Sequence, residues 1–459
     1  MSRRKGEENN NNDESEECEE RLPIDLVLDK LAFQTRSKTC EMDTRERSRV
    51  AKWFGKLLIL LTLVSFIFVG IILNTIQLVL CLSSKLSNDQ RWRRMHKSAN
   101  GYLVYLIFTQ PIFLIYFWPR VDMKVFLADK KLIEEVKTNV LGILIANHTY
   151  ELDWMVCFLL ADQMGNIGSY KCFAKDELKW LPVIGWTFWM SDLIYVKRNW
   201  DQDRLDIEKK LDELMSYDQI LLGIFAEGTR YTKEKYEEAV EFAQNQNLEP
   251  FKYHLFPRRR GFNFTLRQYL RATDSERKID GKTIRLFNME IVLPDRPNFK
   301  HFLNGSYIKA DVYCEEVEIS NDIVEEAKAS KPGEECPRLT NLLLDIYRRK
   351  DEIIEEYHKN GGTFKSLSGS SNGSLYPLKS PYGVAFCWFV FMLFTYGTVT
   401  YLALNVFIQS FEFWSFIVIT LTSGLLMLRR IERESKPNNI RMLNGNHSTK
   451  RQICDPKAA

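Results

Sequence analysis

The sequence predicts an α/β domain over residues 121–362, with membrane-spanning helices before and after it. Within that range, short apolar runs typical of buried strands alternate with charged, helix-like segments such as 201–215 and 341–357. Outside it, the charge-free runs 57–82 and 383–408 each exceed the roughly 20 residues that cross a hydrocarbon core. The expected organisation is therefore one α/β domain between two membrane regions.

The N-terminal region contains a polar tail and two apolar runs. Residues 1–50 are rich in Asn, Glu and Asp and poor in aromatics, which predicts a disordered tail. Within 51–120, we expect 57–82 to span the membrane; it begins too late and is too long for a cleavable signal peptide. The run 101–118 is shorter and contains Pro111, so two readings stay open, a spanning helix, which we favour, and an interfacial one.

The C-terminal region predicts a linker, a membrane hairpin and a tail. Residues 363–382 include a Gly/Ser-rich linker, and 383–430 hold two apolar runs separated by a few residues. Cations lie before the hairpin, at Lys379, and after it, at Arg429 and Arg430, which places both of its ends in the cytosol. The tail 431–459 and the α/β domain are then expected to be cytosolic as well. Near the N-terminus, basic residues flank both sides of the first run, so the excess of cations on cytosolic loops does not fix the orientation of that run.

The stretch Asn147-His148-Thr149-Tyr150-Glu151-Leu152-Asp153 places an imidazole and a carboxylate five positions apart after the apolar run 140–146. Five residues on an α-helix turn the two side chains about 140° apart, so both cannot be mid-helix and still touch. A strand over 140–146, a turn at His148 and a helix holding Asp153 would bring them together. The carboxylate would then orient one ring nitrogen while the other acts as general base on a hydroxyl. A core histidine bonded to a loop carbonyl is the alternative for this motif taken alone.

Two further runs end in polar residues. The strand-like run 220–225 leads into Glu227-Gly228-Thr229-Arg230, in which the glycine allows close backbone approach and the arginine offers a fork of donors suited to phosphate. Taken alone, it could also be an ordinary surface turn with an ion pair. The run 191–198 ends in Lys197 and Arg198. We expect the three strand ends to converge at one edge of the sheet.

In their order and spacing, these motifs resemble those of the 1-acylglycerol-3-phosphate (lysophosphatidic acid) acyltransferases, in particular the eukaryotic gamma and delta subgroup, over about residues 100–365. The resemblance implies an acyltransferase domain with a mixed sheet flanked by helices, and His148 and Asp153 as its catalytic pair. It assigns the acceptor's phosphate to Lys197, Arg198, Glu227, Gly228, Thr229 and Arg230. Contacts with CoA or a lipid headgroup are expected from Lys175, Pro257, Arg258, Arg259 and Arg260. Many relatives have proline at the position of Ala226, a change that removes no functional group.

The implied reaction is transfer of an acyl group from acyl-CoA to the sn-2 hydroxyl of lysophosphatidic acid, giving phosphatidic acid in phospholipid synthesis at the endoplasmic reticulum membrane. The expected partners are these two substrates and the bilayer, with no nucleic acid. The six histidines are scattered singly, so we expect no metal, and no cofactor beyond acyl-CoA as substrate. Reacylation of another lysophospholipid, such as lysophosphatidylinositol or lysocardiolipin, is the alternative within the enzyme class. A catalytically silent lipid-binding protein is the alternative outside it.

Overall fold

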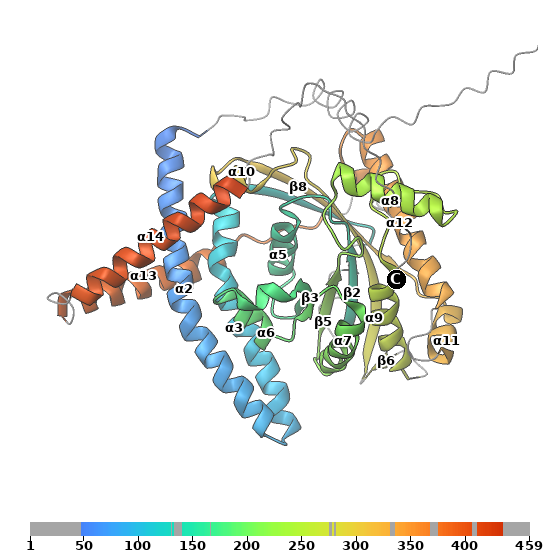
Figure 1. Ribbon diagram of the computed structural model, residues 1–459, viewed down its shortest axis with the longest axis horizontal. Coiled ribbons are helices and arrows are strands. Elements are labelled where there is room, and N and C mark those ends of the chain that lie inside the picture. The colour runs from blue at the N-terminus through green and yellow to red at the C-terminus, as the bar shows by residue number, and fades with distance from the viewer. Residues whose placement is uncertain are drawn as a thin grey trace, which may run out of the picture.

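The computed structural model (Figure 1) describes residues 47–129, 131–132, 140–165, 167–274, 278–279, 281–330, 336–367, 375–405 and 411–434. Its centre is one sheet in the order β1-β8-β7-β2-β5-β3-β4, with β6 paired to β7. The strands are β1 (Val121–Leu127), β2 (Val140–Ala146), β3 (Tyr170–Lys175), β4 (Ile194–Val196), β5 (Ile220–Ile224), β6 (Lys278–Ile279), β7 (Lys282–Val292) and β8 (Ile308–Val317). Strands β7, β2, β5, β3 and β4 are parallel, whereas β8 and its parallel neighbour β1 run the other way. The prediction of a mixed sheet flanked by helices is confirmed.

Helices cover both faces of the sheet (Figure 1). On one face lie α3 (Gln90–Phe117) and α5 (Asp153–Gln163), and on the other lie α7 (Trp200–Met215), α9 (Arg259–Arg271), α11 (Asn321–Ala329) and α12 (Pro337–Lys359). Strand β2 serves both cores, because its side chains alternate between the faces. Leu144 packs on the α3 and α5 side, while Ile143 and Ile145 pack on the other. The remaining short helices are η1 (Asp176–Trp180), α6 (Ile184–Met190), α8 (Lys233–Asn245), α10 (Phe299–Leu303) and η2 (Lys365–Leu367).

The parallel strands place their carboxyl ends at one edge of the sheet. Because β2 pairs with both β5 and β7 in parallel, the residues that follow these three strands emerge side by side. Strands β3 and β4 bring Lys175 and Lys197 to the same edge. In parallel α/β sheets this edge is where ligands bind. The convergence expected from the sequence is therefore present.

The N-terminal helices pack along the α/β domain. Helix α2 (Arg49–Leu86) and α3 form a hairpin, and buried polar contacts join it to the domain. Asn74 donates to Thr187 Oγ1 at 2.8 Å, and Asn100 donates to the Met190 carbonyl at 2.8 Å. Lys97, near the hairpin tip, donates to the Glu213 carbonyl at 3.1 Å. The hairpin and the domain thus form one packed body.

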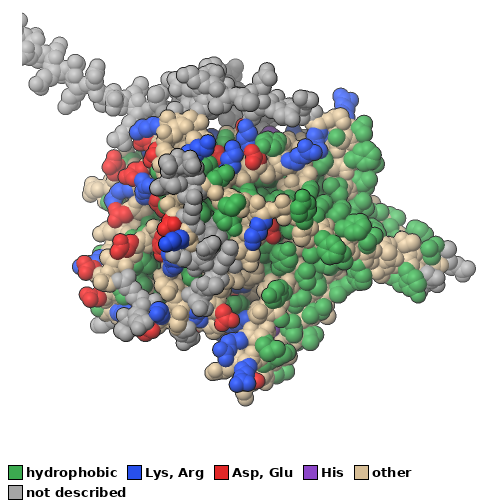
Figure 2. Space-filling view, turned by 180° about the vertical axis from the view of Figure 1, so that it is seen from behind, with side chains coloured by type: hydrophobic (Ala, Val, Ile, Leu, Met, Phe, Trp, Pro, Cys, Tyr) green, Lys and Arg blue, Asp and Glu red, His purple; other side chains and the backbone are tan. Residues whose placement is uncertain are grey.

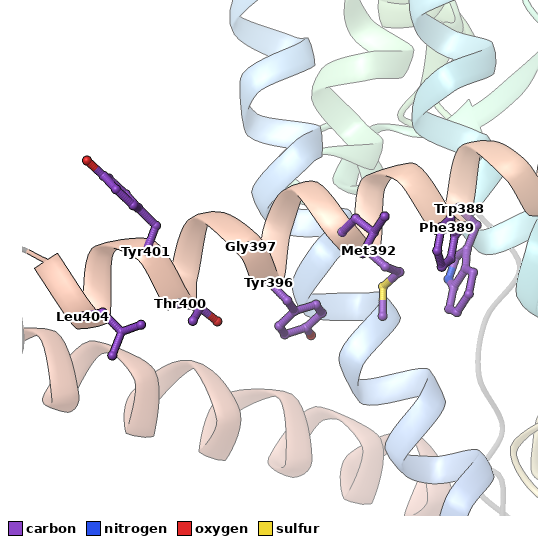
Figure 3. Close-up of a pocket in the computed structure, with 9 residues that line it drawn as sticks. Trp388, Phe389, Met392, Tyr396, Gly397, Thr400, Tyr401 and Leu404 are labelled. Carbon is purple, nitrogen blue, oxygen red and sulfur yellow. The ribbon is translucent and has the colours of Figure 1, made fainter.

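Helices α13 (Tyr382–Asn405) and α14 (Phe411–Glu434) follow the α/β domain. Helix α13 packs on α2 and α3, where the Trp388 ring stacks on Phe113 at 4.0 Å between centroids. An apolar groove of about 760 Å³ lies along α13, and Figure 3 shows Met392, Tyr396 and Leu404 projecting into it. Among the described residues, three helices are long and apolar enough to cross a membrane: α2, α3 and α13.

Hydrophobic side chains gather on the side of the molecule that carries these helices, and charged ones lie over the opposite part (Figure 2). Such a contiguous apolar surface is typical of a membrane-binding face. The predicted tails 1–50 and 431–459 lie largely outside the described residues, although α2 already begins at Arg49 and α14 continues to Glu434.

The predicted linker 363–382 is anchored at both ends. Phe364 is fully buried, and the Tyr376 amide donates to the Val125 carbonyl at 2.8 Å. Residues 368–374 lie outside the described part. Both ends of the segment therefore pack against the α/β domain, and the end at Tyr376 bonds to the edge strand β1.

Candidate active site

His148 and Asp153 meet at the carboxyl end of β2. His148 lies in the turn after the strand, and Asp153 is the first residue of α5. The His148 Nδ1 donates to Asp153 Oδ2 at 3.1 Å, and the Tyr150 amide donates to the same oxygen at 2.9 Å. The imidazole is 26% exposed, whereas the carboxylate is fully buried. Asp153 thus fixes the tautomer that leaves His148 Nε2 as an acceptor toward solvent.

The environment of this pair is apolar. The His148 ring stacks on Phe225 with 4.6 Å between centroids, which fixes the ring plane. Burial raises the pKa of Asp153, and the hydrogen bonds from His148 and Tyr150 oppose that rise. The carboxylate is held in a site where its charge interacts strongly with a protonated imidazole.

Glu227 lies beneath His148 rather than in the open site. Its side chain is 2% exposed, and Oε1 accepts the His148 amide at 3.0 Å. Burial raises its pKa to about 7. This placement favours a role in positioning His148 over the expected direct contact with a phosphate, because a buried carboxylate has no path to the ligand and would repel its negative charge.

Two further residues, Asn147 and Tyr231, hold the turn that contains His148. The motifs did not identify either of them as functional. Asn147 is buried, and its amide bonds both ways to Ile291: Nδ2 donates to the carbonyl at 2.9 Å and Oδ1 accepts the amide at 2.8 Å. The Tyr231 amide donates to the His148 carbonyl at 2.9 Å. These contacts hold the backbone of His148 on both sides. In the sequence, the one sign of this arrangement is an asparagine at the end of a buried strand.

Arg198 is directed toward the Glu227–Arg230 loop. Its backbone adopts a φ of 64°, and its guanidinium lies 3.4 Å from the Gly228 carbonyl. Asp203, in the first turn of α7, accepts the Lys197 amide at 2.9 Å and the Asn199 amide at 3.1 Å. The arginine itself is exposed. Asp203 is therefore a positioning residue for Arg198, found only from the fold.

Arg258 also reaches this loop. Its amide donates to the Ala226 carbonyl at 2.7 Å, and its side chain packs on Gly228, where a Cβ would meet Arg258 Cδ at 2.7 Å. Gly228 has a φ of +71°, so the loop needs glycine for conformation and for space. Thr229 is half-buried and Arg230 is exposed beside it. One loop at the sheet edge thus carries Arg230 and is contacted by Arg198 and Arg258.

The other predicted contacts divide into two groups. Lys175 is exposed at the end of β3, next to β4, and Arg260 is exposed in the first turn of α9. Pro257 is buried and Arg259 is half-buried, which suits a structural role at the start of α9. No assignment to CoA or to a headgroup follows from position alone.

A buried charged cluster supports the loop from below. His254 bonds through Nδ1 to Asp351 Oδ1 at 2.7 Å and through Nε2 to Glu290 Oε1 at 3.0 Å. Burial by itself would lower the pKa of His254, but these two carboxylates outweigh it and raise the pKa to about 10. Lys350 Nζ lies 3.2 Å from Glu290 Oε2. The cluster ties the segment before Arg258 to β7 and α12.

The thiols near the site do not suit nucleophilic chemistry. Burial raises the pKa of Cys157, and it raises the pKa of Cys172 to about 11. Both groups stay protonated at neutral pH. Among the described residues, no group of three or more His, Cys, Asp or Glu side chains is placed to hold a metal ion.

Comparisons with known proteins identify sequence relatives of the chain. Residues 129–269 match the family model described as Acyltransferase. The chain is 30% identical over 297 residues to 1-acyl-sn-glycerol-3-phosphate acyltransferase delta of Homo sapiens, covering 64% of this chain and 72% of that protein. It is 28% identical over 302 residues to the gamma enzyme of Mus musculus, covering 65% and 74%.

Among solved structures, the 1-acyl-sn-glycerophosphate (LPA) acyltransferase PlsC of Thermotoga maritima aligns with a TM-score of 0.33 and 14% identity. That alignment covers 65% of this chain and 95% of the other.

Proposed function

The chain belongs to the family of 1-acyl-sn-glycerol-3-phosphate acyltransferases, and from that premise we propose that it transfers an acyl group from acyl-CoA to the sn-2 hydroxyl of lysophosphatidic acid. The observation that carries the proposal is the His148–Asp153 pair beside the arginine-bearing loop. It combines a base for an alcohol with donors for a phosphate at one edge of the sheet. The product is phosphatidic acid, with CoA released.

The chemistry follows from the orientation of His148. Its Nε2 removes the proton of the sn-2 hydroxyl as the oxygen attacks the thioester carbonyl, an effect worth on the order of 10²–10⁴ in rate. The buried Asp153 carboxylate stabilises the imidazolium that forms. The C–S bond then breaks, and the imidazolium returns its proton to the CoA thiolate. This route needs no acyl-enzyme.

We assign the acceptor's phosphate to the loop Gly228–Arg230 together with Arg198. The two exposed guanidinium groups offer forked donors, and Thr229 adds a hydroxyl and an amide. Arg258, which packs on Gly228, adds positive charge beside this group, and Lys197 precedes Arg198 in the chain. Glu227 acts through His148, whose amide it accepts. In this division, Glu227 positions the base while the arginines bind the substrate.

We place the protein in the endoplasmic reticulum membrane with its α/β domain in the cytosol. The sequence left α3 as a spanning or an interfacial helix. Lys97 at the hairpin tip contacts Glu213 and Ser216 of the α/β domain, so the tip and the domain lie on the same side of the bilayer. This contact supports the interfacial reading of the run 101–118 in α3 over the spanning one that the sequence favoured.

The test is acyl transfer from labelled oleoyl-CoA in membranes that contain the protein, with lysophosphatidic acid offered beside lysophosphatidylinositol and lysocardiolipin. His148→Ala is expected to abolish transfer without removing the protein from the membrane. His301→Ala, which changes an exposed histidine on α10, is the matched control and should remain active. Preference for another acceptor would replace the proposed substrate, and transfer that survives in His148→Ala would refute the base assignment.

A further inference from the structure

A second cavity, away from His148, lies between the tip of the α2–α3 hairpin and the α/β domain. Its volume is about 1160 Å³, slightly above the roughly 300–1,000 Å³ typical of a small-molecule site. Figure 1 shows the hairpin extending past α6 toward this end of the molecule, and Figure 2 shows Lys and Arg side chains at its tip. The lining comes from α2, α3, η1, α6, β4, α7 and the start of β7.

Cations predominate in the lining. From the hairpin come Lys85, Arg93, Arg94 and Lys97, and from the domain come Lys179, Lys197, Lys209, Lys210 and Lys282. Three of the acidic residues in the lining are already paired with two of these lysines. Asp176 binds Lys179 at 2.7 Å, and Lys210 binds both Asp192 at 2.8 Å and Glu213 at 2.6 Å.

The remaining lining acids leave the excess of positive charge in place. Asp203 is occupied by the amides of Lys197 and Asn199, which leaves Asp206 and Asp218 in the lining. No ion pair to Arg93 or Arg94 is present in the part of the chain that the structure describes. The cavity is therefore suited to an anion with several oxygens.

A buried and unpartnered ring nitrogen points to a ligand independently of the charge. His96 lines the cavity and is 9% exposed, and its Nε2 has no hydrogen-bond partner among the described residues. A buried polar atom without a partner costs free energy, and a turn of the His96 ring toward the cavity would let a ligand oxygen recover that cost. Nearby, Lys85 lies over the half-exposed Trp189 ring at 5.5 Å, so the rim offers both charge and an apolar face.

We propose that this cavity binds a phosphoryl group carried by a ligand of the membrane surface or of the reaction. Arginine and lysine from both helices of the hairpin and from the α/β domain, together with a histidine donor, match the several oxygens of a phosphomonoester. Two sources carry that chemistry: the 3′-phosphoadenosine end of CoA, or the headgroup of a phosphorylated phospholipid. The first source rests on the proposed function, because it presumes acyl-CoA as donor, whereas the second does not.

The experiment uses the full chain purified in detergent micelles or in phosphatidylcholine nanodiscs. Adenosine 3′,5′-bisphosphate binding is measured by calorimetry. Retention of phosphatidylinositol 4-phosphate, which carries a phosphomonoester and is not a product of the proposed reaction, is measured by native mass spectrometry. Arg94→Gln and His96→Phe are the test variants. Arg91→Gln is the matched control, because Arg91 is exposed on the same turn of α3 and does not line the cavity.

We expect the test variants to bind one of the two ligands roughly tenfold more weakly, the effect of losing one charge-assisted hydrogen bond, and the control to match the wild type. The ligand that is affected identifies the source. Unchanged binding of both ligands in Arg94→Gln and His96→Phe overturns the proposal, and so does equal weakening in Arg91→Gln. A thermal unfolding midpoint for each variant checks that it folds.

The same preparations separate this inference from the proposed function. His148→Ala should keep the ligand binding and lose acyl transfer. A wild type that binds the bisphosphate or the lipid but transfers no acyl group would refute the proposed function and leave the cavity assignment standing.

Discussion

Asp153→Asn separates the two roles that the structure gives this carboxylate, orienting the histidine and stabilising its charge. Both hydrogen bonds, from His148 Nδ1 and from the Tyr150 amide, end on the same oxygen, Oδ2. An asparagine carbonyl placed there accepts both of them. Its amide nitrogen then takes the position of Oδ1, which has no partner among the described residues. The substitution therefore preserves the tautomer and removes the negative charge.

The expected loss can be worked out from the geometry. The His148 and Asp153 atoms are 3.1 Å apart, which puts the centres of the two charges about 4 Å apart. At an effective dielectric constant of about 20, that separation is worth about 4 kcal/mol between an imidazolium and a carboxylate. Losing it in the transition state lowers kcat by about 10³. Removing the buried charge spares its desolvation cost, but the new amide nitrogen is buried without an acceptor, so we expect the melting temperature to fall by a few degrees at most.

The assay is steady-state acyl transfer with both substrates saturating, with the melting temperature measured on the same sample. Glu151→Gln is the matched control, because it makes the same chemical change two residues away without a contact to His148. A kcat for Asp153→Asn within tenfold of the wild type would refute the argument that the charge of Asp153 stabilises the imidazolium.

Three further predictions follow from other parts of the structure. Arg230→Lys keeps the charge and loses the forked donors, so the KM for lysophosphatidic acid should rise roughly tenfold in steady-state kinetics with little change in kcat; an unchanged KM would count against phosphate binding at Arg230. Burial raises the pKa of Glu227 from 4.5 to about 7, so the folded protein binds this proton more tightly than the unfolded chain. As the pH rises from 4.5 to about 7, the contribution of Glu227 to the free energy of unfolding therefore falls by on the order of 3 kcal/mol. Glu227→Gln should remove that part of the pH dependence of the melting temperature, and identical slopes for both proteins would contradict the buried placement. Finally, cysteines introduced at Asn88, on the hairpin tip, and at Lys252, on the α/β domain, should react with a membrane-impermeant maleimide from the same side of sealed microsomes; protection of only one of them would show that the hairpin tip and the domain lie on opposite sides.

The contact between His148 and Asp153 was predictable because its geometry is local. A buried strand over 140–146 followed by a turn and a helix is enough to bring His148 to Asp153, and no distant residue is needed to see it. The same holds for Arg198 and Arg230, which follow recognisable strand ends. Parallel strands deliver such residues to one edge whatever their order in the sheet.

Only the tertiary structure decided where the Glu227 side chain lies. Its motif reads equally well as a phosphate loop or as a surface turn, and its burial depends on His254 and on α12, which lies more than a hundred residues further along the chain. Likewise, Asp203 reads as an ordinary first-turn helix residue until the fold places its carboxylate against the backbone at Lys197.

By itself, the sequence determined the fold class, the apolar helices and the candidate residues at the ends of the strands, because strand and helix periodicities and short motifs are encoded within a few neighbouring positions. The tertiary structure decided which carboxylate is buried, where the α2–α3 hairpin lies against the α/β domain, and that His96 and Arg94 line one cavity with Lys197. The physical reason is that burial and electrostatic environment depend on segments brought together by packing, and no local pattern records those partners.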